Sequence, residues 1–119
     1  MIYIVDDDSG ARESLCFLLE AEGLEVEAFA SAEAFLEKCG AEDEGCLVVD
    51  LYMPGMSGLD LLETLRARGN RLAAVVVTGS PSLAAEARAG RARAALVEKP
   101  FRDRGLIEAI RRSACAGCC

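Results

Sequence analysis

The sequence predicts an α/β fold with a parallel five-stranded sheet and helices on both faces of that sheet. Three observations support this prediction. Four short apolar runs recur along the 119 residues, and they are continuous rather than alternating, which is typical of parallel strands covered on both faces. A fifth segment alternates apolar and polar residues, as an edge strand does. Segments with helical spacing of apolar residues lie between the runs, so the order is strand–helix repeated five times, with right-handed crossovers.

The expected strands follow from their composition. Residues 2–5, 47–49, 74–77 and 94–97 are rich in β-branched or other aliphatic side chains, and they predict four buried strands. Residues 24–29 alternate, and they predict an edge strand with one face in water.

Serine residues mark the expected helix starts. Ser9 is expected to cap the first helix, which Gly23 ends, and Ser31 is expected to cap the second. The third helix begins at Ser57 or Gly58. The apolar positions that follow helical spacing are Leu15, Leu18 and Leu19 in the first helix, Ala32, Phe35, Leu36 and Cys39 in the second, and Leu59, Leu62 and Leu65 in the third.

Two further helical segments complete the pattern. Residues 82–93 are mostly Ala, Arg and Gly, with Leu83 as the one large apolar anchor, so we expect a short, mobile helix there. The last helix is marked by Leu106, Ile107, Ile110 and Ala114. No linker or repeat is visible, so we expect one domain over residues 1–114. The cysteine-rich residues 115–119 are expected to be disordered or to mark the boundary of a fragment.

The composition excludes several classes of function. Because the chain has no histidine, it cannot build a Ser/His/Asp or Cys/His triad or a histidine-ligated zinc site. Its 13 basic and 20 acidic side chains give a net charge of −7, which disfavours direct binding to nucleic acid or to an anionic membrane. The absence of tryptophan, with 5% aromatic residues, disfavours a platform for base stacking.

The six cysteines do not indicate a disulfide framework. The N-terminus has no basic segment and meets the acidic residues 6–8, so it does not resemble a signal peptide, and no apolar run reaches the length of a membrane span. Cys16, Cys39 and Cys46 are interpreted as small buried hydrophobic residues. We therefore expect a reduced, cytoplasmic protein that does not bind membranes.

Polar residues follow four of the expected strands directly. They are the acidic residues 6–8, Asp50, Thr78 and Lys99. Taken alone, each is an ordinary helix cap, loop residue or surface lysine. In a parallel sheet, however, all four positions lie at the carboxyl edge, where open α/β sheets bind ligands. The joint arrangement therefore predicts a functional site at that edge.

The residue types at this edge indicate phosphoryl chemistry. Two carboxylates 4 Å apart repel by about 4 kcal/mol at an effective dielectric near 20, so the cluster needs a cation. All-oxygen ligands suit Mg²⁺, and a hydroxyl and an ammonium group can bind phosphoryl oxygens. One of the carboxylates could then act as a nucleophile and form an aspartyl phosphate.

The motifs at this edge occur in a characteristic order. They are Val5-Asp6-Asp7-Asp8, Val49-Asp50-Leu51-Tyr52-Met53-Pro54-Gly55-Met56-Ser57-Gly58, Val77-Thr78-Gly79 and Glu98-Lys99-Pro100-Phe101. In this combination the sequence resembles the receiver domain of two-component response regulators, particularly the nitrogen-fixation regulators, over essentially the whole chain. The resemblance implies the flavodoxin-like fold with strand order 2-1-3-4-5.

The resemblance also implies roles for individual residues. Asp50 would accept a phosphoryl group from a partner sensor histidine kinase or phosphotransfer protein. Asp7, Asp50 and the backbone carbonyl of Tyr52 would bind Mg²⁺ or Mn²⁺, and Asp6 would act on the metal through water. Thr78 would bind the phosphoryl group and act as the switch hydroxyl, and Lys99 would pair with a phosphoryl oxygen. The resemblance also implies a cis peptide bond at Lys99–Pro100. It implies no direct role for Asp8. Such a chain is not an enzyme beyond its own phosphorylation and slow autodephosphorylation.

The chain departs from the family pattern on the face that usually carries output. Leu96 stands at the output switch position, three residues before the lysine, where receivers often have Tyr or Phe. Residues 91–95 replace a frequent Gly-Ala pair, and the loop after Thr78 is about one residue short and contains Pro81. A homodimer through the last helix–strand–helix face is one form of output that remains open. No DNA-binding segment follows, so we expect a stand-alone receiver or one cut from a larger protein.

Two alternatives remain. One is a phosphatase of the haloacid dehalogenase type, with Asp6 as nucleophile and Asp8 as acid/base, but no second acidic pair follows Lys99 and no cap segment is present. The other is a degenerate receiver that acts as an interaction module without phosphorylation. Leu96 keeps this alternative open, and four intact residues argue against it: Asp7, Asp50, Thr78 and Lys99.

Overall fold

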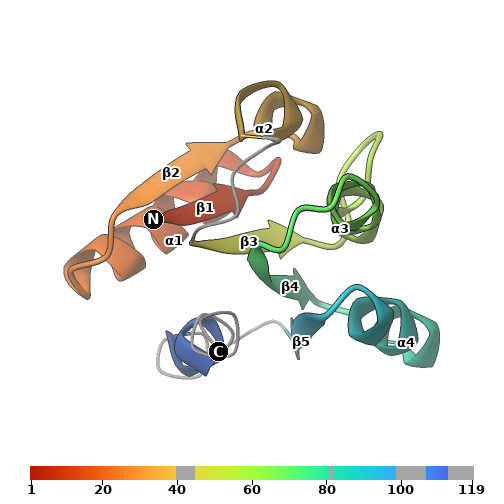
Figure 1. The fold of residues 1–119 in the computed structure, drawn as a ribbon. Coiled ribbons are helices and arrows are strands. Elements are labelled where there is room, and N and C mark those ends of the chain that lie inside the picture. The colour runs from red at the N-terminus through yellow and green to blue at the C-terminus, as the bar shows by residue number, and fades with distance from the viewer. Residues whose placement is uncertain (40–44, 81, 99–106, 113–119) are drawn as a thin grey trace.

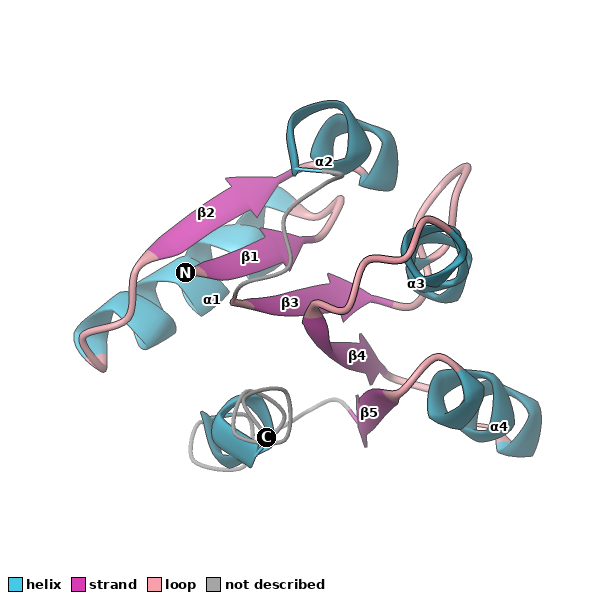
Figure 2. Cartoon of the chain, in the orientation of Figure 1, coloured by secondary structure: helices cyan, strands magenta, loops and turns pink. Residues whose placement is uncertain are grey.

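Five parallel strands form the sheet that the sequence predicts (Figure 1, Figure 2). A computed structural model describes residues 1–39, 45–80, 82–98 and 107–112. The strands are β1 (Ile2–Val5), β2 (Val26–Phe29), β3 (Cys46–Asp50), β4 (Ala73–Thr78) and β5 (Ala94–Glu98). Their order in the sheet is β2-β1-β3-β4-β5, and every neighbouring pair is parallel. The predicted fold is therefore confirmed, with the alternating segment at an edge.

Helices cover both faces of the sheet. They are α1 (Ser9–Ala21), α2 (Ala32–Cys39), α3 (Gly58–Ala67) and α4 (Leu83–Arg91), and residues 107–112 are also helical. Figure 1 shows α2, α3 and α4 on one side of the sheet, with α1 and residues 107–112 on the other. Each side has its own apolar core, because alternate strand residues point to opposite faces: Tyr3 and Val5 join one core, and Ile2 and Ile4 join the other.

The first helix is capped by a different residue from the one expected. Asp8, not Ser9, caps α1, and its Oδ1 atom accepts hydrogen bonds from the backbone amides of Gly10 at 2.9 Å and Ala11 at 3.3 Å. Asp8 has an extended backbone conformation, which directs its carboxylate over the first turn, where the free amides favour negative charge. After α1, Gly23 adopts a positive φ of 80° and ends the helix as expected.

Serine caps the other three labelled helices, at Ser31 and Ser57 as the sequence predicts and also at Ser82. Ser31 Oγ accepts from the amide of Ala34 at 3.1 Å, and Ser82 Oγ accepts from the amide of Ala85 at 3.0 Å. Ser57 caps α3 in a capping box with Asp60, in which each side chain accepts from the backbone amide of the other residue.

The expectation that Leu83 anchors α4 is wrong. Its side chain is 84% exposed, whereas Ala85 and Ala89 are buried against the sheet. Ala85 and Ala89 are four residues apart and share one face of the helix, while Leu83 lies about 200° around the axis from Ala85. Helical phase therefore outweighs side-chain size, and α4 is held by small side chains.

Several expectations concern the chain ends and the cysteines. Cys46 is fully buried, and this burial raises the pKa of its thiol to about 12, while Cys16 is half-buried. The Cys39 side chain, Leu106, Ala114 and residues 115–119 lie outside the described residues.

The strand boundaries differ slightly from those expected. Strand β2 begins at Val26, two residues later than expected, and β3, β4 and β5 are each slightly longer than expected. Among the described residues, no helix is long and apolar enough to span a membrane.

Candidate functional site

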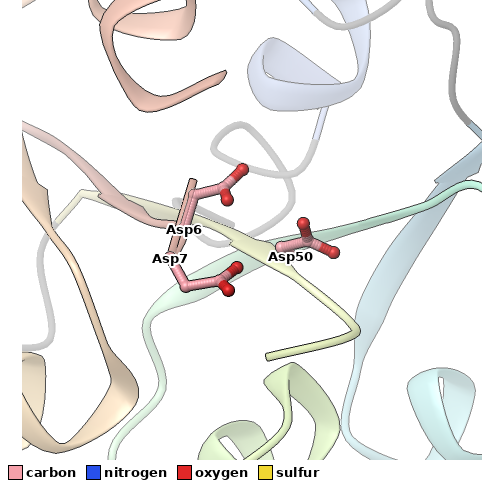
Figure 3. A group of neighbouring side chains, drawn as sticks. All are labelled: Asp6, Asp7 and Asp50. Carbon is pink, nitrogen blue, oxygen red and sulfur yellow. The ribbon is translucent and has the colours of Figure 1, made fainter. Parts of the chain in front are cut away.

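Three carboxylates meet at the carboxyl edge of the sheet. Asp6 and Asp7 directly follow β1, and Asp50 is the last residue of β3, the neighbouring strand. Each offers an oxygen atom, and these three atoms lie within 4.8 Å of one another. Figure 3 shows the Asp6 and Asp7 side chains projecting toward the side where Asp50 lies. The topology thus brings together acids that are more than forty residues apart in the sequence.

The three carboxylates differ in their exposure. Asp6 is 1% exposed, and its Oδ1 atom accepts a hydrogen bond from the amide of Asp8 at 3.0 Å. Asp50 is half-buried, and its Oδ1 accepts from the amide of Tyr52 at 3.1 Å. Asp7 is exposed. The cluster therefore has a buried side at Asp6 and an open side at Asp7, from which a ligand could approach.

The turn after β3 is closely packed against the start of α3. The Leu51 amide donates to the Val77 carbonyl at 2.9 Å, and the Gly58 amide donates to the Leu51 carbonyl at 3.0 Å. A Cβ atom at Gly58 would lie 2.5 Å from the Asp50 carbonyl oxygen. Gly58 is therefore required by the close approach of two backbone segments, in addition to its place at the helix start.

Thr78 lies at the same edge of the sheet, at the end of β4. It is fully buried, and its Oγ1 atom accepts from the amide of Ser80 at 3.1 Å. The Tyr52 hydroxyl donates to the Ser80 carbonyl at 3.4 Å. This contact joins the loop that follows Asp50 to the loop that follows Thr78.

The structure describes some of the predicted site residues and not others. It brings Asp6, Asp7 and Asp50 together and places Thr78 on the neighbouring strand. Lys99 and the Lys99–Pro100 peptide bond lie outside the described residues. Leu96 is half-buried in β5, in register with Val76 of β4, and packs against the core beneath α4.

Asp8 lies beside the cluster but has a structural role. Its Oδ1 atom accepts from the amides of Gly10 and Ala11 as the cap of α1. A phosphatase would use Asp8 as its acid/base, and this engagement with the helix end does not favour that alternative.

Sequence reasoning missed one side chain that contacts the acidic segment. Arg12 Nη1 donates to the backbone carbonyl of Asp6 at 2.8 Å, in a partly buried position. A signal was available, because an arginine in the first turns of a helix that follows three acids can reach back toward them. The position alone did not show which atom it would contact.

Comparisons with known proteins match almost the whole chain. The family described as the response regulator receiver domain matches residues 2–111. The transcriptional regulatory protein FixJ of Azorhizobium caulinodans is 46% identical over 113 residues, covering 94% of this chain and 54% of the relative. The response regulator protein TmoT of Ectopseudomonas mendocina is 40% identical over 112 residues, covering 93% of this chain and 51% of the relative.

The fold is similar to that of a solved structure from the same group. The crystal structure titled FixJ-N superimposes with a TM-score of 0.87 at 40% identity, covering 95% of this chain and 91% of that one. By contrast, this chain spans about half the length of the curated relatives that it matches.

Proposed function

Because the chain belongs to the receiver domain family of response regulators, we propose that it accepts a phosphoryl group on Asp50 in a Mg²⁺-dependent reaction and then changes conformation. The observation that carries the proposal is the meeting of Asp6, Asp7 and Asp50 within 4.8 Å at one edge of the sheet. An isolated carboxylate would offer a nucleophile but could not hold the cation that lowers the repulsion between this carboxylate and an incoming phosphate.

The donor set fits a hard divalent cation. Carboxylates and a backbone carbonyl are the oxygen ligands that Mg²⁺ prefers, and Mn²⁺ accepts the same set. Asp7, Asp50 and the carbonyl of Tyr52 would bind the metal directly, and the buried Asp6 would act through a water molecule. When bound, Mg²⁺ would offset the negative charge of the carboxylates and of the phosphoryl oxygens.

The remaining residues of the edge act on the phosphoryl group itself. An Asp50 carboxylate oxygen attacks phosphorus, the bond from phosphorus to the donor nitrogen breaks, and its electron pair stays on that nitrogen. The Thr78 hydroxyl would donate to a phosphoryl oxygen, for which it must reorient from its present contact with the Ser80 amide. Lys99 would pair with another phosphoryl oxygen. Leu96, which is in register with Val76 two residues before Thr78, would be the side chain that responds to this movement.

The phosphoryl donor in this proposal is a separate protein. The chain contains no histidine, so a phosphohistidine must come from a partner, which is a sensor histidine kinase or a phosphotransfer protein. Hydrolysis of the resulting acyl phosphate would return the chain to its resting state without turnover of an external substrate. We place this exchange in the cytoplasm, and we propose pairing of two copies through the face around β5 as one form of output.

The test is the mass of the intact protein after incubation with acetyl phosphate and Mg²⁺. The wild-type chain should gain the mass of one phosphoryl group, and Asp50→Asn should gain none. Asp8→Asn is the matched control, because asparagine also caps helices well and removes one acid from the same edge. An adduct that persists in Asp50→Asn and disappears in Asp8→Asn would contradict the proposal.

A further inference from the structure

Arg12 connects α1 to the acidic segment that follows β1. Its guanidinium Nη1 atom donates a hydrogen bond of 2.8 Å to the backbone carbonyl of Asp6, in a partly buried position. That carbonyl belongs to the peptide group that joins Asp6 to Asp7. A side chain from the helix therefore holds the main chain from which two of the three clustered carboxylates project.

Two further hydrogen bonds hold the ends of this segment. The Asp6 amide donates to the Phe29 carbonyl of β2 at 3.1 Å, and the Asp8 amide donates to Asp6 Oδ1 at 3.0 Å. Neither bond directly fixes the plane of the peptide group between Asp6 and Asp7. The bond from Arg12 acts on that plane, because its acceptor is the oxygen atom of this peptide group.

The direction of the Asp7 side chain depends on the same peptide plane. Asp7 is exposed, so tight packing does not hold its carboxylate in place. Its Cα–Cβ bond is set by the backbone, and the two peptide planes beside Asp7 determine where that bond points. In Figure 3 the Asp7 carboxylate lies on the side of Asp50, which is the arrangement that this backbone produces.

We propose that Arg12 is a positioning residue of the acidic site, which rests on the metal-dependent function proposed above. By holding the Asp6 carbonyl, it orients Asp7 so that the carboxylates of Asp7 and Asp50 can share one cation. Partners of this kind, which orient ligands without touching the metal, commonly affect metal affinity. The charge of Arg12 acts in the opposite direction, because a fixed positive charge beside the cluster disfavours a second cation.

These two effects predict opposite results for the variant Arg12→Met. If orientation dominates, as we propose, the affinity for Mn²⁺ falls by about tenfold, the lower end of the usual range for such partners. If the charge dominates, the affinity rises. The comparison variants are Arg12→Lys, which keeps a charged donor and should recover part of the affinity, and Arg68→Met, which removes an exposed arginine at the end of α3 and should leave the affinity unchanged.

The experiment has one arm without metal and one with it. In the metal-free protein, amide hydrogen exchange at Asp8 should be about tenfold faster in Arg12→Met than in the wild type, while exchange at Ile4 within β1 stays the same. With metal, Mn²⁺ binding followed by electron paramagnetic resonance should weaken. In addition, the Mg²⁺ concentration for half-maximal phosphorylation should rise, with little change in the maximal rate.

Unchanged exchange at Asp8, or tighter Mn²⁺ binding in Arg12→Met, would overturn the positioning role. A wild-type chain that binds no metal would instead overturn the proposed function. The exchange at Asp8 would then decide the role of Arg12 by itself.

Discussion

Gly58 lies so close to Asp50 that a Cβ atom at Gly58 would stand 2.5 Å from the Asp50 carbonyl oxygen. The first residue of α3 is thus packed directly on the backbone of the proposed phosphoacceptor. Any side chain at this position must displace the end of β3 or the start of α3. The geometry of Asp50 therefore depends on a residue that carries no functional group.

We predict that Gly58→Ala destabilises the fold and slows phosphorylation of Asp50. Overpacking of this kind typically costs about 1–3 kcal/mol, and the displacement falls on Asp50 itself. Unfolding in urea and the rate of phosphorylation by acetyl phosphate measure the two effects. The control is Gly90→Ala, because a Cβ atom at Gly90 meets nothing within 4 Å and alanine favours a helix. Equal stability and equal rates in both variants would show that the contact is not restrictive.

We predict that Asp50→Asn stabilises the metal-free protein and weakens the stabilisation by Mg²⁺. Removing one of three clustered carboxylates lowers their repulsion and also removes a proposed metal ligand. For the wild type, a metal concentration one hundred times the dissociation constant would add about 2.7 kcal/mol to the free energy of unfolding. Thermal melting with and without Mg²⁺ measures both effects. A wild-type melting temperature that does not respond to saturating Mg²⁺ would contradict the metal site.

We predict that Arg93→Gly stabilises the fold. Arg93 has a positive φ of 59°, just after the end of α4, where its amide donates to the Gly90 carbonyl at 3.1 Å. Glycine adopts this conformation without the strain that an L side chain meets there, so the gain should be about 1 kcal/mol. Arg91→Gly, which changes the last residue of α4, should instead lower the stability. Urea unfolding measures both, and a loss of stability in Arg93→Gly would show that the arginine side chain contributes more than the strain costs.

Strand positions and two of the three expected serine caps, those at Ser31 and Ser57, could be predicted because they depend on local patterns. Continuous apolar runs identify buried strands, and capping by Ser57 depends on atoms within one helical turn. The cap of α1 was expected at Ser9 and not at Asp8, because Asp and Ser are equally good caps and the two residues are adjacent. The exposure of Leu83 was missed because side-chain size was considered without helical phase.

The site could be predicted as a set of residues but not as a set of contacts. The topology alone brings the ends of β1 and β3 together, so the meeting of Asp7 and Asp50 follows from the fold. The close approach at Gly58 and the bond from Arg12 to Asp6 depend on how α3 and α1 pack against the sheet. No sequence spacing encodes those distances.

We predict that part of the stability provided by the α3 cap and by the contact between α3 and α4 is lost in acid. Hydrogen bonds from Ser57 lower the pKa of Asp60, and hydrogen bonds from Arg88 lower the pKa of Glu63. A carboxyl group with a lowered pKa in the folded state stabilises the fold above its unfolded value. As the pH falls, this stabilisation begins to decrease near the ordinary pKa of each group, 3.8 for Asp60 and 4.5 for Glu63, and it continues to decrease below that value.

The measurement is the urea midpoint from neutral to acidic pH. Glu63→Gln should reduce the fall in stability below pH 4.5, because the variant has no carboxylate to protonate at this position. Glu86→Gln, an exposed acid in the first turn of α4, is the control. The side chains of Arg88 and Glu63 are 36% and 48% exposed, so the effect should be small and should decrease with added salt. An identical pH profile in Glu63→Gln and the wild type would contradict this contribution.

The last prediction concerns the route by which phosphorylation changes the output face. Helix α4 is held by Ala85 and Ala89 and by an exposed ion pair of Arg88 with Glu63, while its one large apolar side chain, Leu83, projects into solvent. Segments with few buried apolar contacts are the ones that open or rearrange most readily. We therefore predict that a beryllofluoride mimic of the phosphate changes amide exchange mainly within residues 79–93.

Leu96 should limit the response of β5 to the same signal. It lies half-buried beside Val76 and can fill space vacated near Thr78, but it has no ring to project outward and no hydroxyl to donate. Its inward and outward states then differ little in exposed surface, and a ligand shifts such an equilibrium only by its differential affinity for the two states. Leu96→Phe should enlarge the exchange response at β5, and Leu96→Met, which has a similar volume and no ring, should not. A large outward movement of Leu96 in the wild type, with unchanged exchange over residues 79–93, would contradict this route.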